Sequence, residues 1–119
     1  MNTELPMRIA LGQTNQLTPE IIQFAHQTGI TDIQFNMFHG SPQLPGEQRW
    51  EYMDLLRLRT ACEDVGLRLN AIENTPIKFY DKVMLGQPGR DEQIANMQET
   101  IRNMGRAGIP ILGFHFMPN

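Results

Sequence analysis

Cysteine is nearly absent from this sequence, in which Cys62 is the single thiol among 119 residues. One thiol cannot form an internal disulfide, and it cannot by itself supply a thiolate cage for zinc. A disulfide-stapled secreted module and a zinc finger are therefore both excluded. Because Cys62 falls on the apolar stripe of an expected helix, we expect a buried structural thiol and not a nucleophile.

Long apolar runs and a basic surface are lacking as well. No window approaches the roughly 18 consecutive apolar residues of a membrane span, and the first residues lack the charged-then-apolar order of a secretory signal. The ten Lys and Arg residues are outnumbered by thirteen Asp and Glu residues, which gives a net charge of −3. Binding to a phosphate backbone requires a basic face. We expect a cytoplasmic protein whose partners include neither a membrane nor a nucleic acid.

Three segments carry a helix signal, and each follows an apolar run of strand length. Thr18 is a good N-cap, Pro19 suits the first helical position, and Gly29 is placed to close the helix. Apolar residues at spacings of three and four predict two further helices, the last with Asp91 as its N-cap. The predicted helices span residues 19–28, 51–65 and 92–106, the predicted strands 7–12, 31–36, 68–73 and 110–116, and the predicted long loops 37–49 and 74–90.

The alternation of strands and helices favours an α/β fold with parallel strands and right-handed crossovers. Small residues such as Ala71 and Gly113 are expected on the side of the sheet opposite the helices. They suit a confined barrel interior better than the second helix layer of a doubly wound sheet. The sequence therefore predicts a partial (β/α)8 TIM barrel with about four parallel strands and three helices.

A closed barrel of this kind needs about 200 residues or more, so residues 1–119 are expected to form only the N-terminal half of a TIM-barrel domain. Its first and last strands would each present an unpaired apolar edge, which invites pairing with another chain. We expect the partner to be a missing C-terminal half-barrel, or a second copy in a homo-oligomer.

Three helix-ending glycines, Gly29, Gly66 and Gly108, define a weak internal repeat. Six positions after each glycine stands an apolar residue, expected beneath the helices, and these residues are Phe35, Ile72 and Phe114. Seven positions after each glycine stands a polar residue, expected on the other side of the sheet, and these residues are Asn36, Glu73 and His115. The polar set would stand at the carboxyl ends of parallel strands. That edge is where α/β folds place their active sites.

Glu73 and His115 are the predicted catalytic residues. A carboxylate at a strand end could act as a general base, bind a metal or accept hydrogen bonds from sugar hydroxyls, or it could pair with a neighbouring cation on the rim. His115 could be a base, a ligand or a hydrogen-bonded filler between Phe114 and Phe116.

Predicted substrate-binding residues lie at strand ends and in the long loops, and they are Asn36, His39, Asn74 and Arg90. Loop residues of this kind also often satisfy turn backbone groups. Gln13 and Asn15 are further candidates, and Arg49, Trp50 and Tyr80 could clamp an anionic or sugar-like ligand. The sequence contains no dinucleotide or phosphate-loop fingerprint and no closely spaced His, Cys and Asp cluster. A sugar-sized polar rim is predicted, without a complete catalytic set.

Several longer motifs resemble one known enzyme family. They are the stretches 71–77 (AIENTPI), 94–96 (IAN), 100–109 (TIRNMGRAGI) and 114–118 (FHFMP). In this order and spacing they resemble the N-terminal third of mannonate dehydratase, over most of residues 50–118. Glu73 matches the family's Glu in a V-E-S-V-P-like strand end, and His115 replaces the Asn of its Y-N-F-M-P motif.

The resemblance implies a TIM barrel of the xylose-isomerase-like group. Such an enzyme uses Mn²⁺, with Fe²⁺ as the alternative, to dehydrate the sugar acid D-mannonate to 2-dehydro-3-deoxy-D-gluconate in hexuronate (glucuronate) breakdown. The family's metal ligands, histidines with a cysteine and an aspartate, belong to later strands. The resemblance therefore implies metal ligands beyond Asn119 and none in this chain, and Cys62 does not match the ligand cysteine.

Two departures fall on the expected substrate face. One is His115, and the other is the first strand, which reads MRIALGQ from Met7 to Gln13 and lacks the family's tryptophan and G-P turn. Three alternatives therefore stay open: a relative that acts on another sugar acid, a metal-dependent sugar isomerase or epimerase, and a non-catalytic half-barrel that binds a sugar acid or a partner. The 119 residues alone are expected to show little or no turnover.

Overall fold

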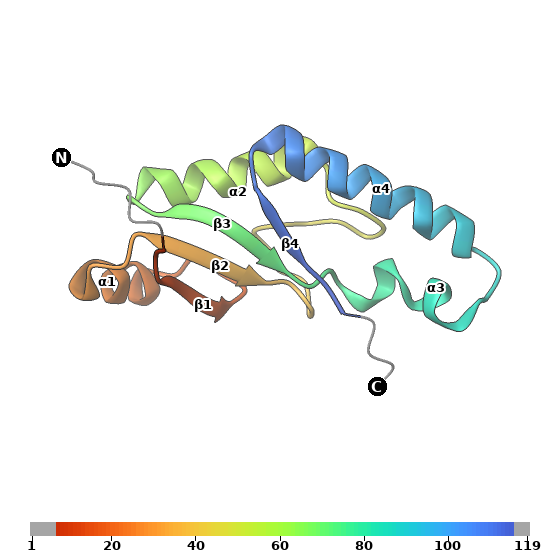
Figure 1. The fold of residues 1–119 in the computed structure, drawn as a ribbon, viewed down its shortest axis with the longest axis horizontal. Helices are drawn as coiled ribbons and strands as arrows, with labels where there is room; N and C mark the ends of the chain where they lie inside the picture. Colours follow the sequence, from red (N-terminus) through yellow and green to blue (C-terminus); the bar gives the residue numbers. More distant parts are fainter. Residues whose placement is uncertain (1–6, 116–119) are drawn as a thin grey trace.

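Four parallel strands form one sheet in the order β1-β2-β3-β4 (Figure 1). The computed structural model describes residues 7–115. The strands are β1 (Ala10–Thr14), β2 (Asp32–Asn36), β3 (Arg68–Glu73) and β4 (Ile111–Gly113). Each neighbour in space is also the neighbour in sequence, as expected when helical crossovers connect successive parallel strands. The predicted α/β class and the four parallel strands are confirmed.

Three long helices connect the strands, and they are α1 (Pro19–Thr28), α2 (Tyr52–Asp64) and α4 (Arg90–Ala107). The Thr18 hydroxyl accepts a hydrogen bond from the Ile21 backbone N–H, and Gly29 closes α1 in the left-handed conformation at φ 74°. These caps fix the bounds that the sequence predicts for α1. Helices α2 and α4 lie side by side on the upper side of the sheet in Figure 1.

Three boundaries differ from the predictions. Strand β1 begins later than expected and continues through polar Gln13 and Thr14, because Thr14 still pairs with Phe35 of β2 after a register irregularity. Helix α4 begins at Arg90 behind Gly89, so Asp91 lies in the first turn, where a carboxylate favours the helix dipole, and is not the N-cap. The segment expected as a long loop over 74–90 contains a 3-10 turn, η1 (Ile77–Phe79), and a short helix, α3 (Asp81–Leu85).

The fourth strand departs furthest from the predicted repeat. Strand β4 spans Ile111–Gly113, and Gly113, not His115, lies opposite Glu73 in the register. His115 is two residues further along, and Phe116 lies outside the described residues. Phe35 and Ile72 are fully buried as predicted, but Phe114 is 71% exposed. The prediction for Phe114 is wrong because no helix of the described part of the chain packs over that position.

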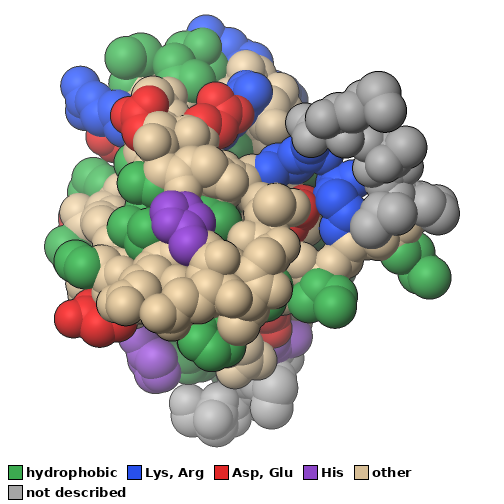
Figure 2. Space-filling view, turned by 90° about the vertical axis from the view of Figure 1, so that its left-hand side faces the viewer, with side chains coloured by type: hydrophobic (Ala, Val, Ile, Leu, Met, Phe, Trp, Pro, Cys, Tyr) green, Lys and Arg blue, Asp and Glu red, His purple; other side chains and the backbone are tan. Residues whose placement is uncertain are grey.

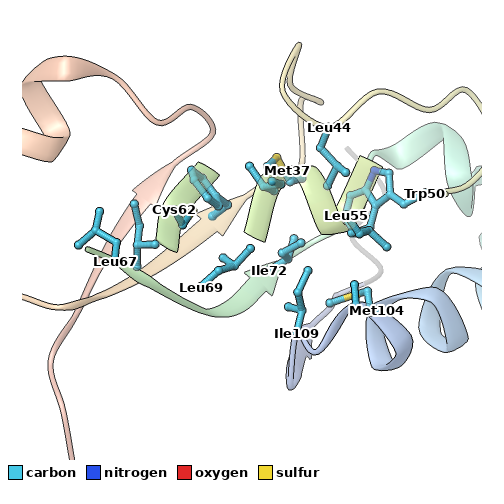
Figure 3. Close-up of a cluster of buried hydrophobic side chains, with 14 of the residues drawn as sticks. Met37, Leu44, Trp50, Leu55, Cys62, Leu67, Leu69, Ile72, Met104 and Ile109 are labelled. Carbon is cyan, nitrogen blue, oxygen red and sulfur yellow. The ribbon is translucent and has the colours of Figure 1, made fainter. Parts of the chain in front are cut away.

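The apolar core fills the space between the sheet and helices α2 and α4 (Figure 3). Leu55, Leu58 and Cys62 are the buried residues of α2, and they pack with Ile72 of β3 and Met104 of α4 in the same cluster. Cys62 is fully buried, which confirms the predicted structural thiol.

Trp50 anchors the long 37–49 connection to helix α4. Its backbone N–H donates to the Thr100 hydroxyl at 3.2 Å, and its carbonyl accepts from the Asn103 side-chain amide at 2.9 Å. Thr100 and Asn103 are themselves buried. Both backbone polar groups of Trp50 thereby have hydrogen-bond partners inside the core. Without these partners, the buried N–H and C=O groups would destabilise the fold.

Asp32 stands at the opposite end of β2 from the expected site and is fully buried. The Arg8 guanidinium donates to both of its carboxylate oxygens, at 3.0 and 3.1 Å, and the Thr31 hydroxyl donates at 3.1 Å. Figure 2 views the molecule from the side at which β2 and β3 begin. Acidic and basic side chains are interspersed there and form no single-sign patch among the described residues in view. Asp32 is accounted for by this ion pair and needs no functional role.

Candidate functional site

A pocket of about 640 Å³ lies at the carboxyl ends of the strands. It is lined by Gln13, Thr14, Asn15, Asn36, Phe38, His39, Asn74 and His115. A neighbouring pocket of about 390 Å³ shares Asn74 and His115 with it and adds Gln34 and Glu73. The structure therefore brings together five of the six predicted site residues, from the ends of three strands and the loops that follow them.

Asn74 turns the chain at the end of β3. It has a φ of 62° and is the one non-glycine residue in the described part of the chain with a positive φ. Asparagine is among the residues that tolerate this conformation best. Its backbone N–H donates to the Gly113 carbonyl at 2.7 Å, which continues the β3–β4 ladder, and its side chain is 5% exposed.

Asn36 and Asn74 meet on the floor of the larger pocket. The Asn36 side-chain oxygen accepts a hydrogen bond from the Phe38 backbone N–H at 3.1 Å and a longer one from the Asn74 side-chain amide at 3.5 Å. The Asn74 side-chain oxygen is buried and has no hydrogen-bond partner among the described residues. A buried acceptor without a partner is rare in folded proteins and points to a missing ligand or water.

Glu73 ends β3, where the register places it between Asn36 of β2 and Gly113 of β4. The Gln34 side-chain amide donates to one carboxylate oxygen of Glu73 at 2.6 Å. A Cβ added to Gly113 would lie 3.6 Å from Cγ of Glu73, so the glycine leaves room beside this side chain. The alternative interpretation, an ion pair with a cation on the rim, is not the contact that the structure gives Glu73. Its carboxylate is held on one side by a neutral amide and is half-buried.

The aromatic rings at the mouth of the pocket come from the loop after β2 and from the segment after β4. Phe38 stacks on His115 with ring centroids 5.6 Å apart and an interplanar angle of 26°, and it meets His39 edge-on at 4.8 Å. His115 is half-buried, and its Nδ1 atom is buried without a partner in the described structure. His39 is exposed. Three groups that can exchange protons, Glu73, His39 and His115, thus line the two pockets.

The remaining candidates lie elsewhere. Arg90 is exposed at the start of α4, where it pairs with Asp91 at 3.1 Å, and it lines neither pocket. Arg49 pairs with Glu51 at 2.7 Å. Trp50 and Tyr80 are buried in the core and cannot clamp a ligand.

Sequence reasoning missed Gln34, Phe38 and Thr14 as lining residues. Gln34 precedes Asn36 by two positions and so shares its face of β2. That alternation is the signal that could have found it. Phe38 carries no such signal, because its place depends on the path of the loop after β2.

The described residues do not fit a metal centre. Between residues 7 and 115 no group of three or more His, Cys, Asp or Glu side chains is arranged to hold an ion. No helix in that range has the length and apolar character to cross a membrane.

Comparison with known proteins places this geometry in a family. The family model for D-mannonate dehydratase (UxuA) matches residues 7–119. The chain belongs to the D-mannonate dehydratase family. A mannonate dehydratase from Streptococcus pneumoniae (strain 70585) is 39% identical over 75 residues, which cover 63% of this chain and 20% of the relative. One from Thermotoga maritima is 33% identical over the same shares.

The fold agrees with a member of this family. The crystal structure of mannonate dehydratase from Streptococcus suis serotype 2 superposes with a TM-score of 0.73 and 29% sequence identity, covering 94% of this chain and 31% of that one. The chain spans about a fifth of the length of the curated relatives that it matches. The expected partial barrel is confirmed as a structural match to part of a family enzyme.

Proposed function

We propose that this chain supplies the first four strands of a sugar-acid dehydratase barrel and one side of its substrate site. The observation that supports the proposal is the polar pocket at the carboxyl ends of parallel strands, in a chain of the D-mannonate dehydratase family. That edge is where barrel enzymes carry their chemistry. The proposed reaction removes water from D-mannonate and gives 2-dehydro-3-deoxy-D-gluconate.

The reaction needs a group that takes the proton from the carbon beside the carboxylate and a group that protonates the departing hydroxyl. Glu73 is the carboxylate that lines the smaller pocket, and the Gln34 amide fixes its orientation. We assign proton abstraction to Glu73 and protonation of the hydroxyl to His115, which lines both pockets. The enol that results becomes the 2-keto acid.

Mn²⁺ belongs to this proposal only through residues outside the described range, because residues 7–115 do not fit a metal centre. No step above depends on the metal. The proposed partners are a sugar acid as the small-molecule ligand and the C-terminal part of a barrel. A homo-oligomer and a cytoplasmic location stay predictions.

Coexpression with the complementary C-terminal part of the Streptococcus suis enzyme tests this function. With D-mannonate and Mn²⁺ we expect a 2-keto-3-deoxy acid that is lighter than the substrate by one water. Glu73→Gln should lower the rate by about 100-fold or more, the range of general acid–base catalysis. Glu20→Gln, at the exposed first turn of α1, is the matched control and should leave the rate unchanged.

Two other experimental results would contradict this proposal, and each would indicate a different function. A product of unchanged mass would indicate a sugar isomerase or epimerase. Saturable binding of D-mannonate without turnover, in a coexpressed complex shown to be assembled, would indicate a non-catalytic binding half-barrel. The 119 residues alone are expected to show little or no turnover.

A further inference from the structure

The hydrogen bonds of Asn36 determine which of its atoms faces a ligand. A backbone N–H can only donate, so the Asn36 atom that accepts from the Phe38 N–H at 3.1 Å is the side-chain oxygen. The side-chain nitrogen of Asn36 makes no hydrogen bond within the described structure. Asn36 therefore offers the larger pocket a donor.

Asn74 offers the complementary group. Its side-chain nitrogen is directed to the same Asn36 oxygen at 3.5 Å, which leaves its own oxygen as a buried acceptor without a partner in the described residues. The residue is 95% buried and lines the pocket. Asn36 thus has a donor and Asn74 an acceptor without a partner in the described residues, on two side chains joined by this 3.5 Å contact. A hydroxyl group, which donates one hydrogen bond and accepts others, fits such a pair, whereas a carboxylate only accepts.

The rest of the lining agrees with a neutral ligand. Among the described residues that form the larger pocket there is no Lys, Arg, Asp or Glu. A carboxylate would find no Lys or Arg partner there, and only His39 and His115 could carry a positive charge. Phe38, which stacks on His115, adds an aromatic ring to this lining.

We propose that Asn36 and Asn74 form a hydroxyl-binding subsite that takes the uncharged polyhydroxylated end of a sugar acid and leaves its carboxylate outside this pocket. This inference rests on the proposed function for the identity of the ligand. The pocket's own chemistry, however, requires only a neutral polyol. The left-handed backbone at Asn74 serves the subsite, because it sets the side chain in the pocket floor.

Nuclear magnetic resonance on the 119-residue chain tests the subsite, with the side-chain amide signals of Asn36 and Asn74 as reporters. The probes are D-mannitol as a neutral polyol, D-mannonate as its acid and succinate as an anion without hydroxyls. D-Mannitol and D-mannonate should shift both amide signals saturably, with dissociation constants within about threefold of each other. Succinate should shift neither. Binding of D-mannonate and succinate without D-mannitol, or saturation by no probe, would overturn the proposal.

Two variants of Asn74 separate binding from folding. Asn74→Gly keeps a residue that adopts φ 62° freely but removes the acceptor, and it should weaken D-mannitol binding about three- to tenfold, the value of one neutral hydrogen bond. Asn74→Asp tolerates the same backbone but sets a second acceptor against the Asn36 oxygen, so it should weaken D-mannitol binding at least as much as Asn74→Gly. Asn96→Ala, on α4 and outside both site pockets, is the control. Equal D-mannitol binding by wild type and Asn74→Gly would refute the subsite.

The subsite and the proposed function can fail separately. If D-mannitol saturates the two amides and D-mannonate does not, the subsite stands and the sugar-acid function fails. If the coexpressed barrel dehydrates D-mannonate while D-mannitol shifts neither amide signal, the function stands and the subsite is wrong.

Discussion

Gln34 of β2 holds the carboxylate of Glu73 on β3 through a 2.6 Å hydrogen bond. The register places Gln34 opposite Ala71 and Asn36 opposite Glu73. The Gln34 side chain therefore extends diagonally, toward the residue two positions beyond its register partner on β3. The small Ala71 side chain leaves that diagonal open. Only one of the two carboxylate oxygens takes part in this bond, and the glycine at 113 leaves space beside the side chain. Glu73 is therefore oriented without being enclosed.

The first prediction concerns the strength of this pair. In a double-mutant cycle, Gln34→Leu and Glu73→Leu should show a coupling of about 1 kcal/mol, because hydrogen bonds to a charged group are the stronger ones. Urea unfolding of the four proteins measures it. Gln13→Leu combined with Glu73→Leu is the control, since Gln13 lines the larger pocket without bonding to Glu73. A coupling below about 0.3 kcal/mol for the Gln34 pair would contradict the prediction.

The second prediction concerns the attachment of Trp50. Thr100→Val keeps the shape of the side chain but leaves the buried Trp50 N–H without its acceptor, so the free energy of unfolding should fall by about 2 kcal/mol. Trp50 is the single tryptophan and 1% exposed, so its fluorescence reports the transition directly. Thr60→Val, on the exposed side of α2, should change stability by less than about 0.5 kcal/mol. Equal effects of the two substitutions would argue against a structural role for the Thr100 hydroxyl.

Local signals in the sequence were sufficient wherever one segment determines its own structure. The cap residues Thr18 and Gly29 define α1, and the apolar stripe places Cys62 in the core. Non-local structure could not be read in the same way. The bond from Gln34 to Glu73 depends on the register between two strands, and Arg90 belongs to an exposed ion pair at a helix start that the sequence predicted two residues later.

The fourth strand shows the same limit. The repeat of helix-ending glycines predicts equal distances to each strand end, and it aligns Glu73 with His115. The observed partner of Glu73 is Gly113, because the chain enters β4 directly after Pro110. The error shifts His115 two residues outward but keeps it on the same side of the strand, so it still reaches the pocket.

The third prediction compares two glycines at helix ends. Gly29 and Gly108 have nearly the same backbone, with φ of 74° and 76°, but different surroundings. A Cβ at Gly29 meets nothing within 4 Å, whereas a Cβ at Gly108 would collide with the Arg59 guanidinium, which donates to the Ala107 carbonyl. Both alanine substitutions should cost about 1 kcal/mol for the left-handed backbone. Gly108→Ala should cost about 1 kcal/mol more, because the Arg59 hydrogen bond is displaced.

The Arg59→Ala background isolates that second contribution. Without the guanidinium, Gly29→Ala and Gly108→Ala should destabilise the fold equally, as measured by thermal or urea unfolding. A difference between the two glycines that persists in this background would assign the extra cost to something other than Arg59.

The last prediction follows from the buried thiol. Burial raises the pKa of Cys62 from 9.0 to about 12, and the neighbouring Glu63 carboxylate adds to the increase. Below about pH 9 the thiol is neutral in both states, so its contribution to stability is fully present there. Between pH 9 and 12 the unfolded chain loses the thiol proton first, and this contribution is lost as the pH rises.

With these pKa values, raising the pH from 8 to 10 should lower the stability of the wild type by about 1 kcal/mol more than that of Cys62→Ala. The alanine variant lacks the thiol but keeps every other titrating group, so the difference between the two pH profiles isolates Cys62. At pH 8 the native thiol should also resist a disulfide reagent until urea unfolds the chain, since the thiolate is the reactive form. Parallel pH profiles, or rapid labelling of the native chain, would show that the thiol is accessible to water and would contradict its place in the core.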